Sequence, residues 1–152
     1  MRLLSFDPSS SKTGYAVADC KDDKLSILET GIVDLKKKRD PLLYLYRELN
    51  KLLEEFKPDK VLLEKPFYSV NAQTLIKLGE IRGVILLTCQ AFNIEVEEFT
   101  PAEVKVCITG YGRASKEEVL YMVNSLYKLN LDSYDIADAV AILHTYTMQV
   151  KV

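Results

Sequence analysis

Short apolar runs separated by turn-forming residues predict three strands at the start of the chain. Residues 3–6 are apolar apart from one serine, and they end at Asp7, which is followed by a proline and three serines. That composition is typical of a buried strand entering a turn. Residues 13–18 and 25–35 read as two further strands, joined by a polar turn. Three consecutive strands with tight connections predict an antiparallel meander.

The remainder of the sequence alternates helical and strand patterns. After Asp40 and Pro41, a helix start signature, apolar residues recur at helical spacing until Pro58. Residues 61–64 and 94–99 read as strands. Helices are predicted over residues 71–92, from the cap at Thr100, from the capping box at Ser115, and over residues 134–148. We therefore expect one α/β domain over residues 1–152, with a mixed five-stranded sheet and helices on both faces.

Charge and cysteine content narrow the class of protein. The 20 basic and 22 acidic residues give a net charge of −2, which excludes a uniformly basic DNA coat but allows a local basic groove. Three scattered cysteines and one histidine argue against structural zinc and favour reduced, buried thiols in a cytoplasmic protein. No apolar stretch is long enough for a bilayer and no signal peptide is visible, so we expect no membrane partner.

Four acidic residues in apolar surroundings carry the chemical signal. Asp7 and Glu64 each end an apolar strand, and Asp135 and Asp138 are three residues apart on one helix face. If the two strands are parallel neighbours, their carboxylates lie at one edge of the sheet, where open α/β sheets place ligands. An oxygen-only donor set suits Mg²⁺, and two such ions about 3.5–4 Å apart support phosphodiester cleavage.

Each of these signals also has a purely structural interpretation. Asp7 with Pro8 is a common way to start a turn, and Glu64 with Lys65 reads as a surface pair. Asp135 reads as a favourable charge at a helix N-terminus. Only the joint occurrence of the acids at the ends of core elements favours a site.

The ordered motifs resemble those of the RuvC family of Holliday junction resolvases over essentially the whole chain. The matching stretches are residues 7–15, 63–67, 71–84, 100–105, 110–116 and 135–141, the last with the pattern D-x-x-D-A-x-A. Any single motif is common, whereas the ordered set is specific to the family.

The resemblance implies an RNase H-like fold, a cytoplasmic homodimer, and Mg²⁺-dependent nicking of two strands at a four-way DNA junction in recombination and repair. It implies two Mg²⁺ per site, with Mn²⁺ as a substitute, held by Asp7, Glu64, Asp135 and Asp138. Lys105 and Lys116 would join the catalytic set near the scissile phosphate. The DNA contacts implied are Phe67, Tyr68, Arg82, Lys105, Arg113 and Lys116.

Local charge and aromatic content agree with a DNA-binding face. Residues 105–128 contain four basic and two acidic residues, whereas residues 95–103 contain four acids and no base. Phe67 lies in a predicted loop, where an aromatic ring could stack on an unpaired base. The helix over residues 71–92 is apolar on more than one face, which suits a dimer seam as well as a buried central helix.

Departures from the family pattern leave alternatives open. Ser9 stands where glycine is usual, and little chain follows the last helix, so docking to RuvA–RuvB and the cleavage-sequence preference are undecided. A nuclease of broader specificity for branched DNA, or a non-catalytic junction-binding protein, are alternatives. A sugar-kinase or ATPase half shares the core fold, but it needs a second lobe and a glycine-rich adenosine loop that this chain lacks.

Overall fold

The structure is a computed structural model that describes residues 1–66, 68 and 71–149. Its strands are β1 (Arg2–Pro8), β2 (Lys12–Lys21), β3 (Lys24–Asp34), β4 (Lys60–Glu64) and β5 (Glu95–Phe99). Its helices are α1 (Pro41–Phe56), α2 (Ala72–Ala91), α3 (Pro101–Thr109), α4 (Lys116–Tyr127) and α5 (Tyr134–Thr147). The predicted order of elements is confirmed, with small differences at the ends.

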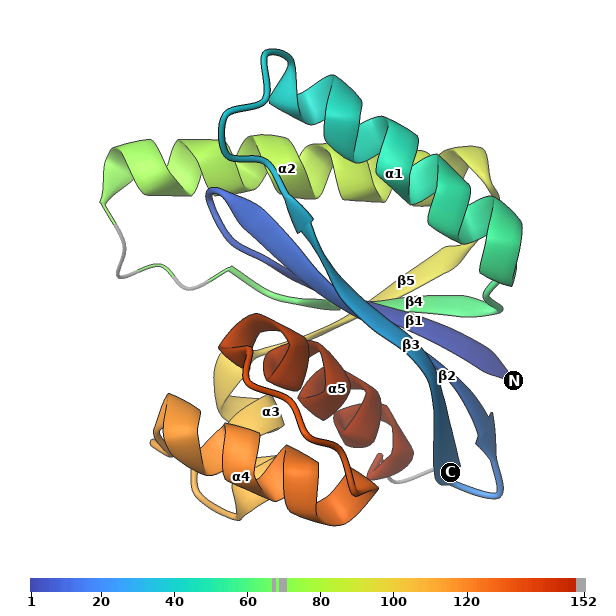
Figure 1. Ribbon diagram of the computed structural model, residues 1–152, viewed down its shortest axis with the longest axis vertical. Coiled ribbons are helices and arrows are strands. Elements are labelled where there is room, and N and C mark those ends of the chain that lie inside the picture. Colours follow the sequence, from blue (N-terminus) through green and yellow to red (C-terminus); the bar gives the residue numbers. More distant parts are fainter. Residues whose placement is uncertain (67, 69–70, 150–152) are drawn as a thin grey trace.

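The five strands form one mixed sheet in the order β3-β2-β1-β4-β5. The meander pairs antiparallel, β1 with β2 and β2 with β3, whereas β4 runs parallel to β1 and β5 parallel to β4. Helices α1 and α2 cover one face of the sheet, and α3, α4 and α5 lie against the other (Figure 1). The parallel pair at the centre follows from the helical crossover between β3 and β4.

Alternation along the strands divides the core into two layers. Leu4 and Phe6 of β1 pack with buried residues of α1 and α2, whereas Leu3 packs with α5 on the opposite face. Ser5 is fully buried and donates a 2.6 Å hydrogen bond to the carbonyl oxygen of Ala139, which ties β1 to α5. Burial of α5 along most of its length explains its nearly uninterrupted apolar sequence.

Most of the helix caps predicted from sequence are present. Thr100 with Glu103, and Ser115 with Glu118, form complete capping boxes, and Asn71 accepts a 2.9 Å bond from the Thr74 backbone amide. The Asp40 prediction was right only in position, since its side chain makes no capping hydrogen bond and α1 begins with Pro41 at its first turn. Proline supplies a preset φ there and has no amide hydrogen to satisfy.

Close packing of α5 on the sheet depends on Gly14. A Cβ added to Gly14 would lie 2.4 Å from the carbonyl oxygen of Asp135, closer than any side chain allows. Gly14 pairs with Asp7 across β1 and β2, so the first turn of α5 rests directly beside the end of β1. In the described part of the chain, no helix has the length and apolar character needed to cross a membrane.

Candidate active site

The strand register brings Asp7 and Glu64 to the same end of the sheet. Phe6 pairs with Leu63 in the parallel β1–β4 ladder, and Asp7 and Glu64 are the next residue on each strand. Asp135 and Asp138 come from the first two turns of α5, whose N-terminus is capped by the Ser133 side chain on the Ile136 amide. The structure thus gathers the four acids that the sequence singled out.

Asp7 lies at the centre of this acid cluster, which we define as Asp7, Glu64, Asp135 and Asp138. Burial, followed by the negative charges of Glu64 and Asp138, raises the pKa of Asp7 well above its usual range. A hydrogen bond with Glu64 and the charge of Asp135 act in the same direction. Burial and the neighbouring negative charges therefore oppose the charged form of Asp7.

Two other members of the cluster share this behaviour. Burial raises the pKa of Glu64, and the hydrogen bond from Asp7 and the charge of Lys105 partly oppose the rise. Burial, together with repulsion from Glu64 and Asp135, raises the pKa of Asp138 to about 7, again partly opposed by Asp7 and by Lys116. The two lysines predicted for the catalytic set thus act on the cluster electrostatically, one on each of two acids.

Asp135 has a different partner, which the sequence analysis did not assign to the site. Lys12 at the start of β2 places its Nζ 3.2 Å from Oδ2 of Asp135. Lys12 lies in the motif that begins at Asp7, but nothing in the residues around it marks it as a partner of an acid. The ion pair could be recognised only once the packing of α5 on β2 was known.

Arg82 holds the backbone at the end of β4 that carries Glu64. Its Nη1 donates a 2.6 Å hydrogen bond to the carbonyl oxygen of Glu64, and its Nη2 lies 2.9 Å from Oε1 of Glu98 on β5. Only 11% of the side chain is exposed. These contacts support a positioning role for Arg82, and its predicted contact with DNA stays a prediction.

The other predicted DNA-contacting residues differ in how far they are exposed to solvent. Arg113 and Lys116 are exposed, Lys105 is half-buried on α3, and Tyr68 is 77% exposed. Phe67, predicted to stack on a base, lies outside the described residues. The single histidine, His144, is half-buried and hydrogen-bonds through Nδ1 to the Tyr127 hydroxyl at 2.5 Å.

The cluster suits a hard divalent cation by its chemistry. It offers only carboxylate oxygens, and burial raises the pKa of Asp7, Glu64 and Asp138, with repulsion from neighbouring acids adding to the rise at Asp7 and Asp138. In the described part of the chain, no three His, Cys, Asp or Glu side chains are yet arranged to hold an ion. The four carboxylates lie together but interact with protein groups: Asp135 faces Lys12, and Asp7 shares hydrogen bonds with neighbouring acids.

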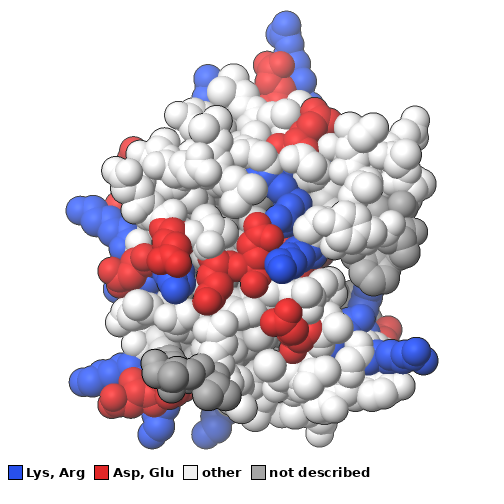
Figure 2. Space-filling view, turned by 180° about the vertical axis from the view of Figure 1, so that it is seen from behind, with Lys and Arg blue, Asp and Glu red and all other residues white. Residues whose placement is uncertain are grey.

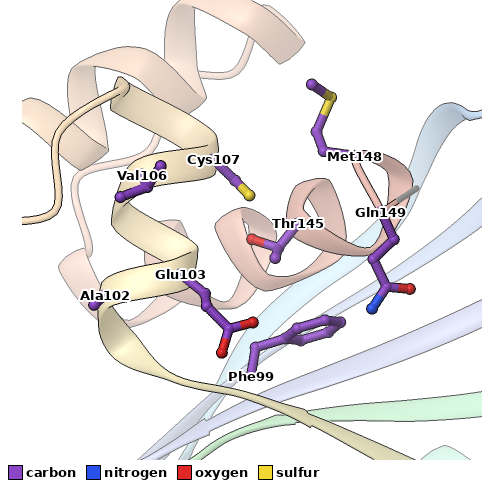
Figure 3. A pocket seen from close by; sticks show the side chains of 8 residues that line it. All are labelled: Phe99, Ala102, Glu103, Val106, Cys107, Thr145, Met148 and Gln149. Carbon is purple, nitrogen blue, oxygen red and sulfur yellow. The ribbon is translucent and has the colours of Figure 1, made fainter.

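The molecular surface carries side chains of both charges, and one of its hollows adjoins the acid cluster. Acidic and basic side chains lie interleaved across the middle of the face seen from behind (Figure 2). A hollow of about 220 Å³ is lined by Glu64, Arg82, Ser9 and Ser10, among others, and it adjoins the cluster. A larger hollow of about 450 Å³ lies between α3 and the end of α5 (Figure 3), and none of the four acids lines it.

The fold and the cluster define the class of protein. A five-stranded mixed sheet between helices, with acids at the ends of its central parallel strands and on the last helix, is the RNase H-like arrangement. The sequence profile described as Crossover junction endodeoxyribonuclease RuvC matches residues 3–146. The chain belongs to the RuvC family.

Curated relatives and solved structures agree with this assignment. The chain is 40% identical over 148 residues to Crossover junction endodeoxyribonuclease RuvC of Caldicellulosiruptor saccharolyticus, covering 93% of this chain and 89% of the relative. It is 37% identical over 151 residues to the protein of the same name from Dictyoglomus thermophilum, covering 96% of both. The structure of Thermus thermophilus RuvC in complex with Holliday junction substrate superposes with a TM-score of 0.85 at 25% identity, covering 95% of this chain and 92% of that one.

Proposed function

We propose that this protein resolves four-way DNA junctions by paired, metal-dependent phosphodiester hydrolysis. The observation that carries the proposal is the acid cluster at the ends of β1 and β4, in a chain that belongs to the RuvC family. The Thermus thermophilus relative, which has the same fold, is described in complex with Holliday junction substrate.

Asp7, Glu64, Asp135 and Asp138 would hold divalent cations, Mg²⁺ or Mn²⁺. When bound, two such ions supply an activated water and stabilise the leaving 3′ oxygen. Asp7 would be the central ligand of this set, because its charge interactions reach all three other acids.

Lys105 and Lys116 would hold the scissile phosphate against the cluster. Each already interacts with one acid, Lys105 with Glu64 and Lys116 with Asp138, so both ammonium groups lie near the place where the phosphate would enter. Exposed Arg113 and Tyr68 extend the contact surface beyond the site. Phosphate contacts of this kind position a duplex without reading its sequence.

A homodimer would present two such sites to a junction with two strands to cut. Helix α2 carries an outward stripe of Ile76, Gly79, Gly83 and Leu87, in which both large residues are 64% exposed. Nothing lies within 4 Å of a Cβ added to either glycine. Small residues flanked by exposed apolar ones allow two helices to approach closely.

The dimer can be tested apart from catalysis. The Ile76→Glu variant should elute as a monomer in size-exclusion chromatography with light scattering, and it should lose paired cleavage. Leu43→Glu on α1, which alters another exposed apolar residue (42% exposed), serves as a matched control and should leave the dimer intact. A dimer that persists in Ile76→Glu would place the seam elsewhere.

The main experiment uses a synthetic four-way junction with Mg²⁺ omitted and then restored. We expect binding without Mg²⁺, symmetric nicking with it, and weak activity on forks and flaps. Equal activity on all branched substrates would favour the nuclease of broader specificity. Binding with no cleavage under any divalent cation would favour the non-catalytic junction-binding protein. Docking to RuvA–RuvB is a further proposal, tested by co-sedimentation on the same junction.

A further inference from the structure

Lys12 is bound to the acid cluster from a strand that contributes none of its acids. Its Nζ lies 3.2 Å from Oδ2 of Asp135, with 38% of the Lys12 side chain and 23% of the Asp135 side chain exposed. Across the described residues, this is the only ion pair within 4.0 Å that any member of the cluster makes. Lys12 thus offsets part of the negative charge of the cluster, alongside the longer-range effects of Lys105 on Glu64 and Lys116 on Asp138.

The backbone on both sides of this ion pair is fixed. Ser9 closes the β1–β2 turn, since its amide and its hydroxyl each donate a 2.8 Å hydrogen bond to the Lys12 carbonyl oxygen. The Lys12 amide lies 3.3 Å from the same hydroxyl oxygen. On the other side, the contact between Gly14 and the Asp135 backbone fixes where α5 begins. The positions of Lys12 and Asp135 are therefore set by the β1–β2 turn and by the packing of α5 on β2.

The carboxylate of Asp135 cannot keep its full interaction with the Lys12 ammonium group and bind a metal ion at the same time. Asp135 is the member of the acid cluster whose carboxylate is turned to the ammonium group of Lys12. An entering divalent cation brings positive charge into the position that the ammonium group already neutralises. Two cations near one carboxylate repel each other, so occupancy by one weakens the other.

We propose that Lys12 is a resident counter-ion of the acid cluster, which competes with divalent cations for Asp135 and so sets the cation concentration at which the site fills. This inference rests on the proposed metal-dependent function. It assigns to Lys12 a positioning role, acting on catalysis through Asp135.

Calorimetric titration of the DNA-free protein with Mn²⁺ tests the competition directly. The Lys12→Met variant should bind the ion two to five times more tightly than the wild type, which corresponds to ~0.4–1 kcal/mol, the range of partly exposed ion pairs. Lys24→Met removes the same charge at the far end of the same hairpin and should leave the Mn²⁺ affinity unchanged. Lys12→Arg should bind like the wild type.

The outcomes separate this inference from the proposed function. Unchanged or weaker Mn²⁺ binding in Lys12→Met, with normal binding in the wild type, overturns the competition and leaves the metal-dependent function intact. A folded wild type that binds neither Mn²⁺ nor Mg²⁺ overturns both. The Asp7→Asn variant gives the blank for binding outside the cluster.

Thermal unfolding provides a second readout that does not depend on activity. Without metal, Lys12→Met should melt below the wild type, because the cluster loses its counter-ion. Saturating Mn²⁺ should raise the melting temperature of Lys12→Met more than that of the wild type. If Lys12 had a purely structural role, Lys12→Met would melt below the wild type by the same amount with and without Mn²⁺. The rise in melting temperature caused by Mn²⁺ would then be equal in the two proteins, and this result would overturn the inference.

Discussion

The guanidinium group of Arg82 donates a 2.6 Å hydrogen bond to the carbonyl oxygen of Glu64. The donor belongs to α2 and the acceptor to the last residue of β4, and the same guanidinium binds Glu98 on β5 at 2.9 Å. One side chain therefore fixes the ends of two neighbouring parallel strands at the point where Glu64 of the acid cluster is presented. A charged group so enclosed is strongly coupled to its partners.

We expect Arg82→Met to lower kcat for junction cleavage about 10–100-fold, while the junction Kd changes less than about twofold, because misplacement of Glu64 affects the chemical step most. Stability should fall by ~2–4 kcal/mol, since Glu98 and the Glu64 carbonyl oxygen lose a buried partner. Steady-state kinetics and denaturant unfolding measure the two effects. Glu95→Gln, which alters a carboxylate that is 75% exposed, is the control.

A direct DNA contact by Arg82 would produce the opposite pattern. Its loss would weaken junction binding and reduce the salt dependence of the Kd by about one phosphate contact, with little change in kcat. The salt dependence of binding therefore decides between the positioning role that the structure supports and the contact expected from sequence.

The Asp7→Asn variant should abolish cleavage and retain junction binding, because it replaces a cation ligand by a side chain of nearly equal shape. The same change should raise the free energy of unfolding of the metal-free protein by ~1–3 kcal/mol at pH 8, since burial and three neighbouring acids oppose the Asp7 charge. Gel mobility, a nicking assay and urea unfolding check these outcomes. Cleavage at a normal rate by Asp7→Asn would contradict the site assignment.

The raised pKa of Asp138 predicts that the metal-free protein loses stability as pH rises. A group whose pKa rises from 3.8 to about 7 on folding binds its proton more tightly in the native state, so its contribution is fully present below about pH 4. It declines between about pH 4 and pH 7 and is absent above pH 7. The unfolding free energy of the wild type, minus that of Asp138→Asn, should fall by ~4 kcal/mol across this range.

Divalent cations should reverse that loss at pH 8, because they bind the deprotonated acids of the native state. Unfolding at pH 4.5 and pH 8, with EDTA or with Mg²⁺, measures the effect. A difference between wild type and Asp138→Asn that does not vary with pH would contradict a raised pKa at this site.

The Gly14→Ala variant should be strongly destabilised, by ~2–4 kcal/mol, because its Cβ would meet the Asp135 carbonyl oxygen at 2.4 Å and force α5 away from β1. Cleavage should fall with it, since Asp135 and Asp138 move with the helix. Gly112→Ala, whose Cβ would meet Val106 at an ordinary 3.5 Å, is the matched control and should change stability by less than about 1 kcal/mol. Equal melting temperatures for the two variants would show that α5 can shift freely.

The sequence by itself determined the elements and the identity of the gathered acids. Periodicity and turn chemistry are local properties, and they indicated every strand and helix because each element's apolar face must be buried. Asp7, Glu64, Asp135 and Asp138 stood out for the same reason, as charges placed at the ends of apolar segments.

The tertiary structure decided which side chains act on those acids. The partnership of Lys12 with Asp135 joins residues more than a hundred positions apart, and it depends on how closely α5 packs over Gly14. The burial of Arg82 against Glu64 and Glu98 depends on the α2 crossover and the parallel register of β4 and β5. Neither leaves a local pattern, because charge pairing across elements is set by packing geometry rather than by the order of residues along the chain.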